Sequence, residues 1–288
     1  MLPLRKAVIP VAGYGTRFLP ATKSIPKEML PVVDKPQLQY LVEEAVASGI
    51  HDVIFVTGRN KHAIENHFDV SFELESVLRR AKKVNELKSV QRISQMADFA
   101  YIRQPMPLGH GDAVLRATRF LSPDEPIAVI FGDDLIESKI PALKQMLPAF
   151  HKYRAPIIAL ARVALQEATK FGVVRIRRAA LARTHQILDF VEKPKRPPSP
   201  YAIVGKYILT PEFLATLKRM RRRGKPLDLG DVIPVYIKKG MPLYGVEIQG
   251  TWHDCGSKLG YIKANIAYAQ KRKDMAHDLR TFLKNLNY

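Results

Sequence analysis

Short continuous apolar runs alternate along the first half of the chain with stretches whose apolar residues recur at helical spacing. Continuous runs indicate strands buried on both faces, and recurrence every three or four residues indicates helices packed on one side. The strands expected from the runs are 7–11, 52–57, 99–104, 127–131 and 157–163. The helices expected between them are 38–46, 61–68, 73–92, 109–121 and 141–153. This alternation predicts an α/β fold with a Rossmann-like, mostly parallel mixed sheet flanked by helices.

Beyond about residue 155 the pattern becomes that of half-exposed strands, in which apolar and polar residues alternate. The strands expected here are 171–176, 187–192 and 201–208, and a helix is expected at 211–222. Prolines exclude a helix from the loop at 193–200, which reads KPKRPPSP. This part of the chain is therefore expected to form a β-rich insertion.

Residues 257–286 are expected to be mainly helical, with Ile262, Ile266 and Ala269 on one stripe. Helical periodicity does not decide whether this stripe packs on the body of the protein or on a second subunit. We expect one domain over residues 1–288, since this length fits a single large α/β core. Its parts would be a first half at about 1–154, the insertion at about 155–256 and a C-terminal helical segment at about 257–288.

Charge and cysteine usage narrow the class of protein. The formal net charge is +19, but the densest basic clusters, 175–183 and 218–225, lack interleaved aromatic residues. We therefore expect a solvated surface that attracts anionic substrates and no nucleic-acid partner. A single cysteine, Cys255, and the absence of any apolar run long enough to span a bilayer predict a cytoplasmic protein with no membrane partner. Residues 1–6 lead straight into the first strand, so no signal peptide is expected.

The first expected strand runs into a turn bracketed by Gly13 and Gly15, and three cationic residues follow closely. They are Arg17, Lys23 and Lys27. Glycine lets the backbone approach a ligand and aim successive N–H groups at one point, an arrangement that suits an anion. Three cations within reach of that point predict a polyphosphate site, whereas an ordinary turn with solvated charges would not need them so densely placed.

Two common phosphate-binding motifs do not fit this loop. Phe18 stands where the dinucleotide-binding pattern needs its third glycine, and no GK[ST] sequence of a P-loop is present. A helix in this region is disfavoured by Pro20, Pro26, Pro31 and Pro36. We therefore expect loop amides and the three cations to hold the phosphates, without a helix dipole behind them.

Adjacent carboxylates, Asp133 and Asp134, follow the apolar strand at 127–131. Paired carboxylates at a strand end suit a hard divalent cation such as Mg²⁺. A turn whose aspartates cap the next segment fits the same residues equally well. Gly13, Gln104 and Asp133 all follow expected strand ends, which is the edge of a parallel sheet where ligands bind.

Residues 13–36, GYGTRFLPATKSIPKEMLPVVDKP, resemble the signature of the sugar nucleotidyltransferases, most closely that of the bacterial enzymes acting on UTP and glucose 1-phosphate. A motif of this length is highly specific, and the similarity extends through nearly the whole chain. The resemblance implies UTP and glucose 1-phosphate as substrates, Mg²⁺ as the cofactor and a homodimer or homotetramer. It implies in-line transfer of the uridylyl group with release of diphosphate.

The resemblance also implies roles on the phosphate side. Arg17 and Lys27, with Lys23, would hold the triphosphate, and Asp133 would bind Mg²⁺. Asp254, in TWHDCG, is similar to a late aspartate that meets the same metal. The other nucleotide contacts implied are Ala12, Gly13, Gly15, Thr16, Gly109 and Asp134.

On the sugar side, VEKP at 191–194 resembles the EKP motif of the family. Its glutamate, Glu192, would accept hydrogen bonds from sugar hydroxyls, and its lysine, Lys193, would hold the sugar phosphate; acceptor-only and donor-only groups fit these tasks. The backbone positions that would contact the sugar are Gly172, Val204 and Gly205. Without the resemblance, Glu192 and Lys193 would be interpreted as an ion pair at a strand end.

Glu28 and Gln104 match the positions that contact the base, and Gly109 would let the chain lie against the ring. Uracil and thymine carry an N3–H donor that the Glu28 carboxylate would accept, whereas cytosine presents an acceptor at N3. This favours UTP or dTTP over CTP and does not separate the first two. A thymidylyltransferase using dTTP, and a non-catalytic regulatory homologue that binds sugar nucleotides, remain alternatives.

Two stretches depart from the family pattern. His110 and Asp112, in PLGHGDAV, stand where the family usually has PLGLGHAV. Residues 225–233, KPLDLGDVI, replace the usual GEIQLTDAI. The positions that carry over are Leu229, Asp231 and Ile233. Asp112 is expected early in a helix, while a contact between His110 and the nucleotide stays open, as does any change in the sugar-side wall or the oligomer contact.

Overall fold

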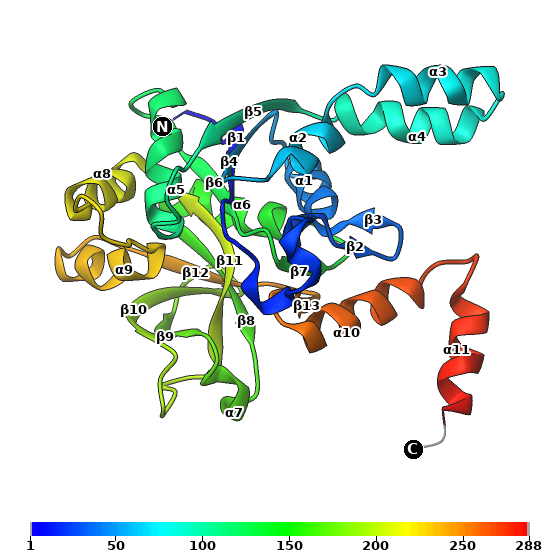
Figure 1. Cartoon of the computed structure of the whole chain (residues 1–288). Coiled ribbons are helices and arrows are strands. Elements are labelled where there is room, and N and C mark those ends of the chain that lie inside the picture. The colour runs from blue at the N-terminus through cyan, green and yellow to red at the C-terminus, as the bar shows by residue number, and fades with distance from the viewer. Residues whose placement is uncertain (1, 287–288) are drawn as a thin grey trace.

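Nine strands form the central sheet of the computed structural model, which describes residues 2–286 (Figure 1). In spatial order they are β5 (Asp98–Arg103), β4 (Asp52–Thr57), β1 (Lys6–Val11), β6 (Ile127–Ile130), β11 (Tyr201–Leu209), β8 (Ile157–Arg162), β12 (Tyr244–Glu247), β10 (Thr184–Glu192) and β9 (Gly172–Arg178). Pairing is parallel through β5, β4, β1 and β6 and between β8 and β12. β11 and β10 pair antiparallel with their neighbours. The predicted α/β fold with a mixed sheet is confirmed.

Helices cover both faces of this sheet. Successive side chains of a strand point to opposite faces, and in the buried strands the side chains on both faces are apolar. On β1, Ala7, Ile9 and Val11 belong to one hydrophobic cluster and Val8 belongs to the other. The first cluster takes in residues of α1 (Gln37–Ala47), α2 (His62–Phe68) and α6 (Ala142–Tyr153). The second takes in residues of α5 (Gly109–Ala117), α8 (Pro211–Met220) and α9 (Leu229–Lys238).

Two further pairs of short strands are not predicted by the apolar pattern. β7 (Asp134–Glu137) pairs antiparallel with β13 (Thr251–Asp254), with Asp134 opposite Asp254. β2 (Pro31–Val32) pairs with β3 (Lys35–Pro36), and a short helix, α7 (Leu165–Ala168), precedes β9. The β7–β13 pair brings the late aspartate to the loop that follows β6.

The single helix predicted over residues 73–92 is wrong. This segment forms two helices, α3 (Phe72–Arg80) and α4 (Val84–Ser94), which lie against each other and project from the body (Figure 1). The chain reverses between them at Lys82, whose φ of 56° is in the left-handed region. Because no glycine or proline marks the turn, the helical periodicity continues across it without a visible break.

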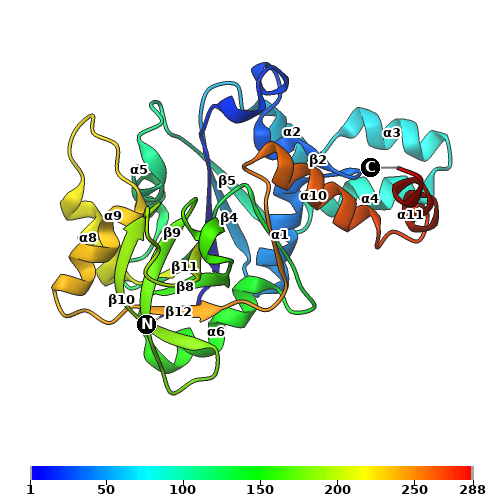
Figure 2. The same ribbon diagram turned by 90° about the horizontal axis from the view of Figure 1, so that it is seen from below.

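The predicted C-terminal helical segment is divided into α10 (Lys258–Ala269) and α11 (Ala276–Asn285), and residues 287–288 lie outside the described residues. α10 packs on the body through Tyr261, Ala264 and Tyr268, whereas Ile262 is 53% exposed. The predicted stripe is therefore not the face that packs on the body. In Figure 2, α8 and α9 lie at one end of the molecule and α3, α4 and α11 at the other. Within residues 2–286, no helix has the length and apolar character needed to cross a bilayer.

Candidate active site

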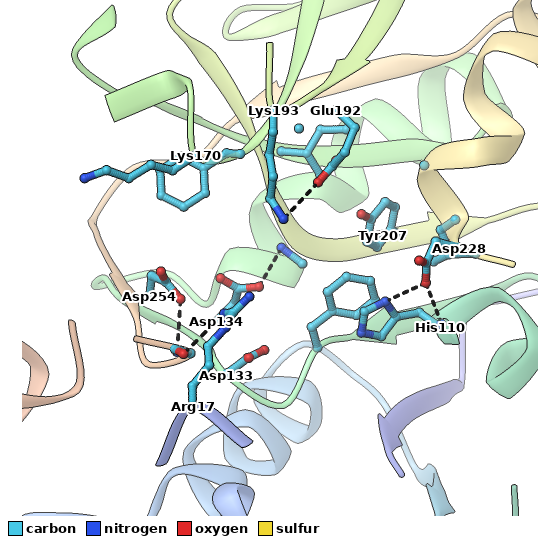
Figure 3. A pocket seen from close by; sticks show the side chains of 18 of the residues that line it. Arg17, His110, Asp133, Asp134, Lys170, Glu192, Lys193, Tyr207, Asp228 and Asp254 are labelled. Atoms are coloured by element: carbon cyan, nitrogen blue, oxygen red, sulfur yellow. Dashed lines mark hydrogen bonds and ion pairs between the residues drawn. The ribbon is translucent and has the colours of Figure 1, made fainter. Parts of the chain in front are cut away.

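A cavity of about 520 Å³ opens where the loops after β1 and β6 meet the ends of β9, β10 and β13 (Figure 3). Its wall combines residues that are far apart in the chain, including Arg17, Asp133, Lys193, Asp228 and Asp254. β1 and β6 run parallel and adjacent, so their C-terminal loops lie side by side. The cavity therefore lies at the carboxyl ends of the parallel strands, where the sequence predicts ligand binding.

Asp133 is held between the cations of the glycine loop. Lys27 Nζ donates a hydrogen bond to Asp133 Oδ2 at 2.7 Å, and Arg17 donates to Gly256 O at 3.3 Å, next to the same carboxylate. Burial opposes ionisation of Asp133, but the charge and hydrogen bond of Lys27 lower the pKa of this carboxyl. Asp133 is thus an anion lying beside two cations at the floor of the cavity.

Asp133 and Asp254 form a two-carboxylate pair around Gly256. A Cβ at Gly256 would lie 2.7 Å from Asp133 Oδ2 and 3.0 Å from Asp254 Oδ1, so only glycine leaves the space between them open. Burial raises the pKa of Asp254. No cluster of three or more His, Cys, Asp or Glu ligands occurs among residues 2–286. Two carboxylates that line one cavity fit Mg²⁺, which commonly keeps water and substrate phosphates as its other ligands.

Asp134 faces the protein more than the cavity. Its Oδ1 accepts a hydrogen bond from Trp252 Nε1 at 2.6 Å, and its Oδ2 accepts one from Gly205 N at 3.1 Å. Burial, assisted by the charge of Asp133, raises the pKa of Asp134 to about 7. Asp134 therefore joins β7 to β13 and β11, which fixes the position of Asp133 beside it.

The glycine loop forms part of the cavity wall. Gly15 has a φ of 66°, and its carbonyl accepts a hydrogen bond from Thr22 Oγ1 at 2.7 Å. Gly15, Thr16 and Arg17 line the cavity. Ala12 and Gly13 stand outside its lining, with Ala12 buried and Gly13 exposed. Lys23 is exposed and also stands outside the lining, so it is set apart from Arg17 and Lys27.

The EKP residues line the opposite side of the cavity (Figure 3). Lys193 Nζ lies 3.6 Å from Glu192 Oε1, and the backbone of Lys193, with a φ of 44°, donates to Phe171 O at 3.0 Å. A Cβ at Gly172 would lie 2.7 Å from Phe190 Cε2 and 3.0 Å from Glu192 Oε2, so Gly172 lies close to both side chains. Gly205 lines the cavity, whereas the side chain of Val204 is fully buried in the core, leaving only its backbone for any ligand.

The predicted base-contacting residues lie behind the cavity lining. Glu28 is 1% exposed, and its Oε2 accepts a hydrogen bond from Lys61 Nζ at 2.7 Å. Its other oxygen, Oε1, has no hydrogen-bond partner among residues 2–286. Gln104 is also buried and donates through Nε2 to Gly109 O and Asp112 Oδ2. Both side chains therefore retain an acceptor oxygen without a protein donor.

His110 and Asp228 are cavity residues that the sequence left unassigned (Figure 3). Asp228 Oδ1 accepts hydrogen bonds from His110 N at 2.8 Å and from His110 Nδ1 at 3.1 Å. The hydrogen bond from the His110 side chain lowers the pKa of Asp228. The imidazole stacks on Phe131, with ring centroids 4.1 Å apart. Further lining residues without a predicted role are Lys170, Phe171, Phe190, Tyr207 and Trp252.

The two stretches that depart from the family pattern lie against each other. Gly111 N donates to Leu227 O at 2.9 Å, and Leu227 N donates to Leu108 O at 2.9 Å. Gly109 has a φ of 87°, and a Cβ there would lie 2.5 Å from Leu227 O. Gly109 therefore accommodates the protein's own backbone. The departures from the family pattern marked both stretches as unusual. Nothing in the sequence indicated that the two stretches contact each other in the fold.

Cys255 lies directly beside the carboxylate pair, yet we expect it to be unreactive. It is 1% exposed, and burial raises the pKa of its thiol to about 12. Because thiol reagents attack the thiolate, the native protein should resist an aromatic disulfide reagent at pH 8, while the unfolded chain releases one equivalent of chromophore. Complete labelling of the native protein within minutes would contradict this burial.

Comparison with known proteins identifies the family of the chain. Residues 6–271 match the nucleotidyl transferase family. A UTP–glucose-1-phosphate uridylyltransferase of Staphylococcus epidermidis is 42% identical over 290 residues, covering 100% of both chains. A UDP-glucose pyrophosphorylase complexed with UDP-glucose is 40% identical with a TM-score of 0.83, covering 94% of this chain and 100% of its own. The UTP-bound enzyme of Acinetobacter baumannii is 34% identical with a TM-score of 0.90, covering 99% and 100%. The chain belongs to the nucleotidyl transferase family.

Proposed function

We propose that the chain transfers the uridylyl group of UTP to α-D-glucose 1-phosphate, giving UDP-glucose and diphosphate. The Staphylococcus relative is named for this activity, and the two similar structures are complexes with UDP-glucose and UTP. One observation carries the proposal. Arg17 lines the cavity opposite Lys193 (Figure 3), and Lys27 also lines it through its ion pair with Asp133. Cations thus lie on both sides of one space, which would suit two separate phosphate groups.

In this reaction an anionic phosphate oxygen of glucose 1-phosphate attacks the α-phosphorus of UTP in line. The bond from that phosphorus to the bridging oxygen of the β-phosphate breaks, and diphosphate leaves with the electron pair. The nucleophile is already anionic, so no general base is required. Catalysis then consists of positioning and charge neutralisation. Arg17 and Lys27 hold the triphosphate and the leaving diphosphate, assisted by Lys23 from the exposed edge of the loop, and Lys193 positions the attacking phosphate.

Enzymes of this family generally use a divalent metal. We assign Mg²⁺ to Asp133 and Asp254, since both carboxylates line the cavity and approach the same point beside Gly256. When bound there, the ion would neutralise negative charge on the reacting phosphates. Asp134 supports this site through its hydrogen bonds to Trp252 and Gly205.

We assign the contacts with the base to side-chain oxygens that have no donor within the protein, and the other nucleotide contacts to backbone groups. Gln104 Oε1 accepts no hydrogen bond from residues 2–286 and is not sealed from solvent, which suits an N3–H donor; Glu28 Oε1 also lacks a partner but is buried, so Glu28 would contribute from beneath the base. Backbone groups of Ala12, Gly13, Gly15, Thr16 and Gly109 complete the nucleotide contacts. The sugar contacts would come from Gly172, Glu192, Val204 and Gly205.

A matrix of nucleoside triphosphates against sugar 1-phosphates, scored by diphosphate release with Mg²⁺ present, tests the proposal. We expect UTP with glucose 1-phosphate to exceed every other pair. Turnover of dTTP in preference to UTP would make the protein a thymidylyltransferase instead. Binding of sugar nucleotides without any diphosphate release would make it a non-catalytic regulator, although such a protein need not keep Arg17, Lys27, Asp133 and Lys193 in one cavity.

The division into a nucleotide-binding half, a sugar-binding insertion and a C-terminal segment stays a prediction, as does assembly into a homodimer or homotetramer. A cytoplasmic location with no nucleic-acid or membrane partner is likewise our proposal, supported by the lone cysteine.

A further inference from the structure

A buried carboxylate, Asp112, lies in the first turn of α5 beside Gln104. Asp112 is 2% exposed, and its Oδ2 accepts hydrogen bonds from Gln104 Nε2 at 2.9 Å and from Arg116 Nε at 2.8 Å. Its Oδ1 lies 3.1 Å from the guanidinium of Arg221. Although burial opposes ionisation, the hydrogen bonds from Gln104 and Arg116 lower the pKa of Asp112. Asp112 is therefore an anion that can only accept hydrogen bonds.

The neighbours of the Gln104 amide permit one orientation. Nε2 donates both to Asp112 Oδ2 and, at 3.1 Å, to Gly109 O. Each partner is an acceptor, so turning the amide over would set Oε1 against two acceptors and lose both bonds. Because both neighbours are acceptors, the NH₂ group of the amide must face them and its oxygen must face away from α5.

The end that faces away from α5 is an acceptor without a partner. Within residues 2–286, no group donates a hydrogen bond to Gln104 Oε1, and this atom is not among those sealed from solvent. Gln104 directly follows β5, at the same sheet edge as the glycine loop after β1. A ligand at this edge that carries a donor would complete the hydrogen bonding of Gln104.

We propose that Asp112 is a positioning residue that selects the nucleobase through Gln104. This inference rests on the proposed function, in which Gln104 contacts the base. With Oε1 fixed as an acceptor, the site pairs with the N3–H of uracil or thymine and faces the N3 acceptor of cytosine unfavourably. The aspartate that departs from the family pattern thereby acquires a role in specificity without touching the substrate.

The test replaces Asp112 by asparagine, which has the same shape but presents either an oxygen or an NH₂ group. Of the two acceptors that fix Gln104, only Gly109 O then remains, so the turned amide that offers Nε2 to cytosine N3 becomes less unfavourable. For D112N we expect the ratio of kcat/KM for UTP to that for CTP to fall by about tenfold, the scale of one mispaired hydrogen bond. The change should appear in KM, with kcat for UTP altered by less than about threefold, because the phosphate contacts are unchanged. Asp124→Asn, an exposed aspartate on another loop, is the matched control and should keep the wild-type ratio.

A double-mutant cycle separates positioning from a merely structural role. In a Gln104→Ala background the amide is gone, so adding D112N should leave the UTP to CTP ratio unchanged. A further fall in the ratio there would overturn the proposal. If D112N does not fold, Asp112→Ala removes the acceptor that Gln104 Nε2 contacts; a wild-type ratio in that variant would equally overturn the proposal.

Calorimetric titration of UTP and CTP without sugar phosphate keeps this test apart from the test of activity. A wild-type protein that binds UTP in preference to CTP, with D112N reducing the preference, supports base selection even if no diphosphate is released. In that event only the proposed activity fails. An active enzyme whose D112N variant retains the wild-type preference overturns the role of Asp112 alone.

Discussion

Replacing Asp133 by asparagine is expected to lower kcat by about 10²–10³-fold, the scale measured when one preorganised electrostatic group is removed from a transition state. The substitution keeps the shape of the side chain and its hydrogen bond with Lys27, which lies 2.7 Å away, but removes the negative charge. Without that charge the carboxylate pair with Asp254 no longer suits a divalent cation. The loss should therefore be accompanied by a weaker dependence of the rate on Mg²⁺ concentration.

Diphosphate release at saturating substrates, titrated with Mg²⁺, measures both effects in one series. Asp124→Asn carries the same chemical change at an exposed position and should behave as the wild type. Thermal unfolding of both variants shows whether the loss has a structural origin. An Asp133→Asn enzyme that turns over within about threefold of wild type, with an unchanged Mg²⁺ titration, would remove Asp133 from the proposed metal site.

The strands and most helices of the first half could be predicted because their signal is local, whereas β12 and α9 in the second half were not predicted. Residues 52–57 form one apolar run closed by a glycine, and β4 spans Asp52–Thr57. The pattern at 73–92 misled because Lys82, a residue with a side chain, adopts the left-handed conformation that usually marks a glycine. β7 and β13 were missed because each is short and is stabilised by pairing across more than a hundred residues.

The site divides in the same way. Arg17, Lys27 and Asp133 could be found because a dense run of glycine and cations, and a pair of carboxylates at a strand end, each point to phosphate or metal within a few residues. His110 and Asp228 are 118 residues apart, and nothing in either stretch specifies the other. Their contact depends on α9 packing beside α5, which is a property of the tertiary fold. Sequence reasoning could mark both stretches as unusual but could not join them.

Lys193→Ala is expected to lower kcat by about 10²-fold while changing the affinity for UTP by less than about threefold. Lys193 lies across the cavity from Arg17, beside Glu192, and under the proposed function its ammonium would hold the phosphate of the sugar while Arg17 holds the leaving diphosphate (Figure 3). Alanine leaves the strain of the left-handed backbone conformation unchanged, since lysine and alanine both carry a Cβ at this φ of 44°. The variant therefore removes the charge without adding a new conformational freedom.

Lys195→Ala is the matched control, because Lys195 is an exposed lysine on the same loop and does not line the cavity. Calorimetry gives the Kd for UTP, and initial rates over a range of glucose 1-phosphate give kcat and KM for the sugar. A group that holds only the attacking phosphate must appear in the second set of constants and not in the first. If Lys193→Ala weakens UTP binding as much as it slows turnover, the lysine is holding the nucleotide instead. The division of the cavity into two phosphate-binding sides would then have to be redrawn.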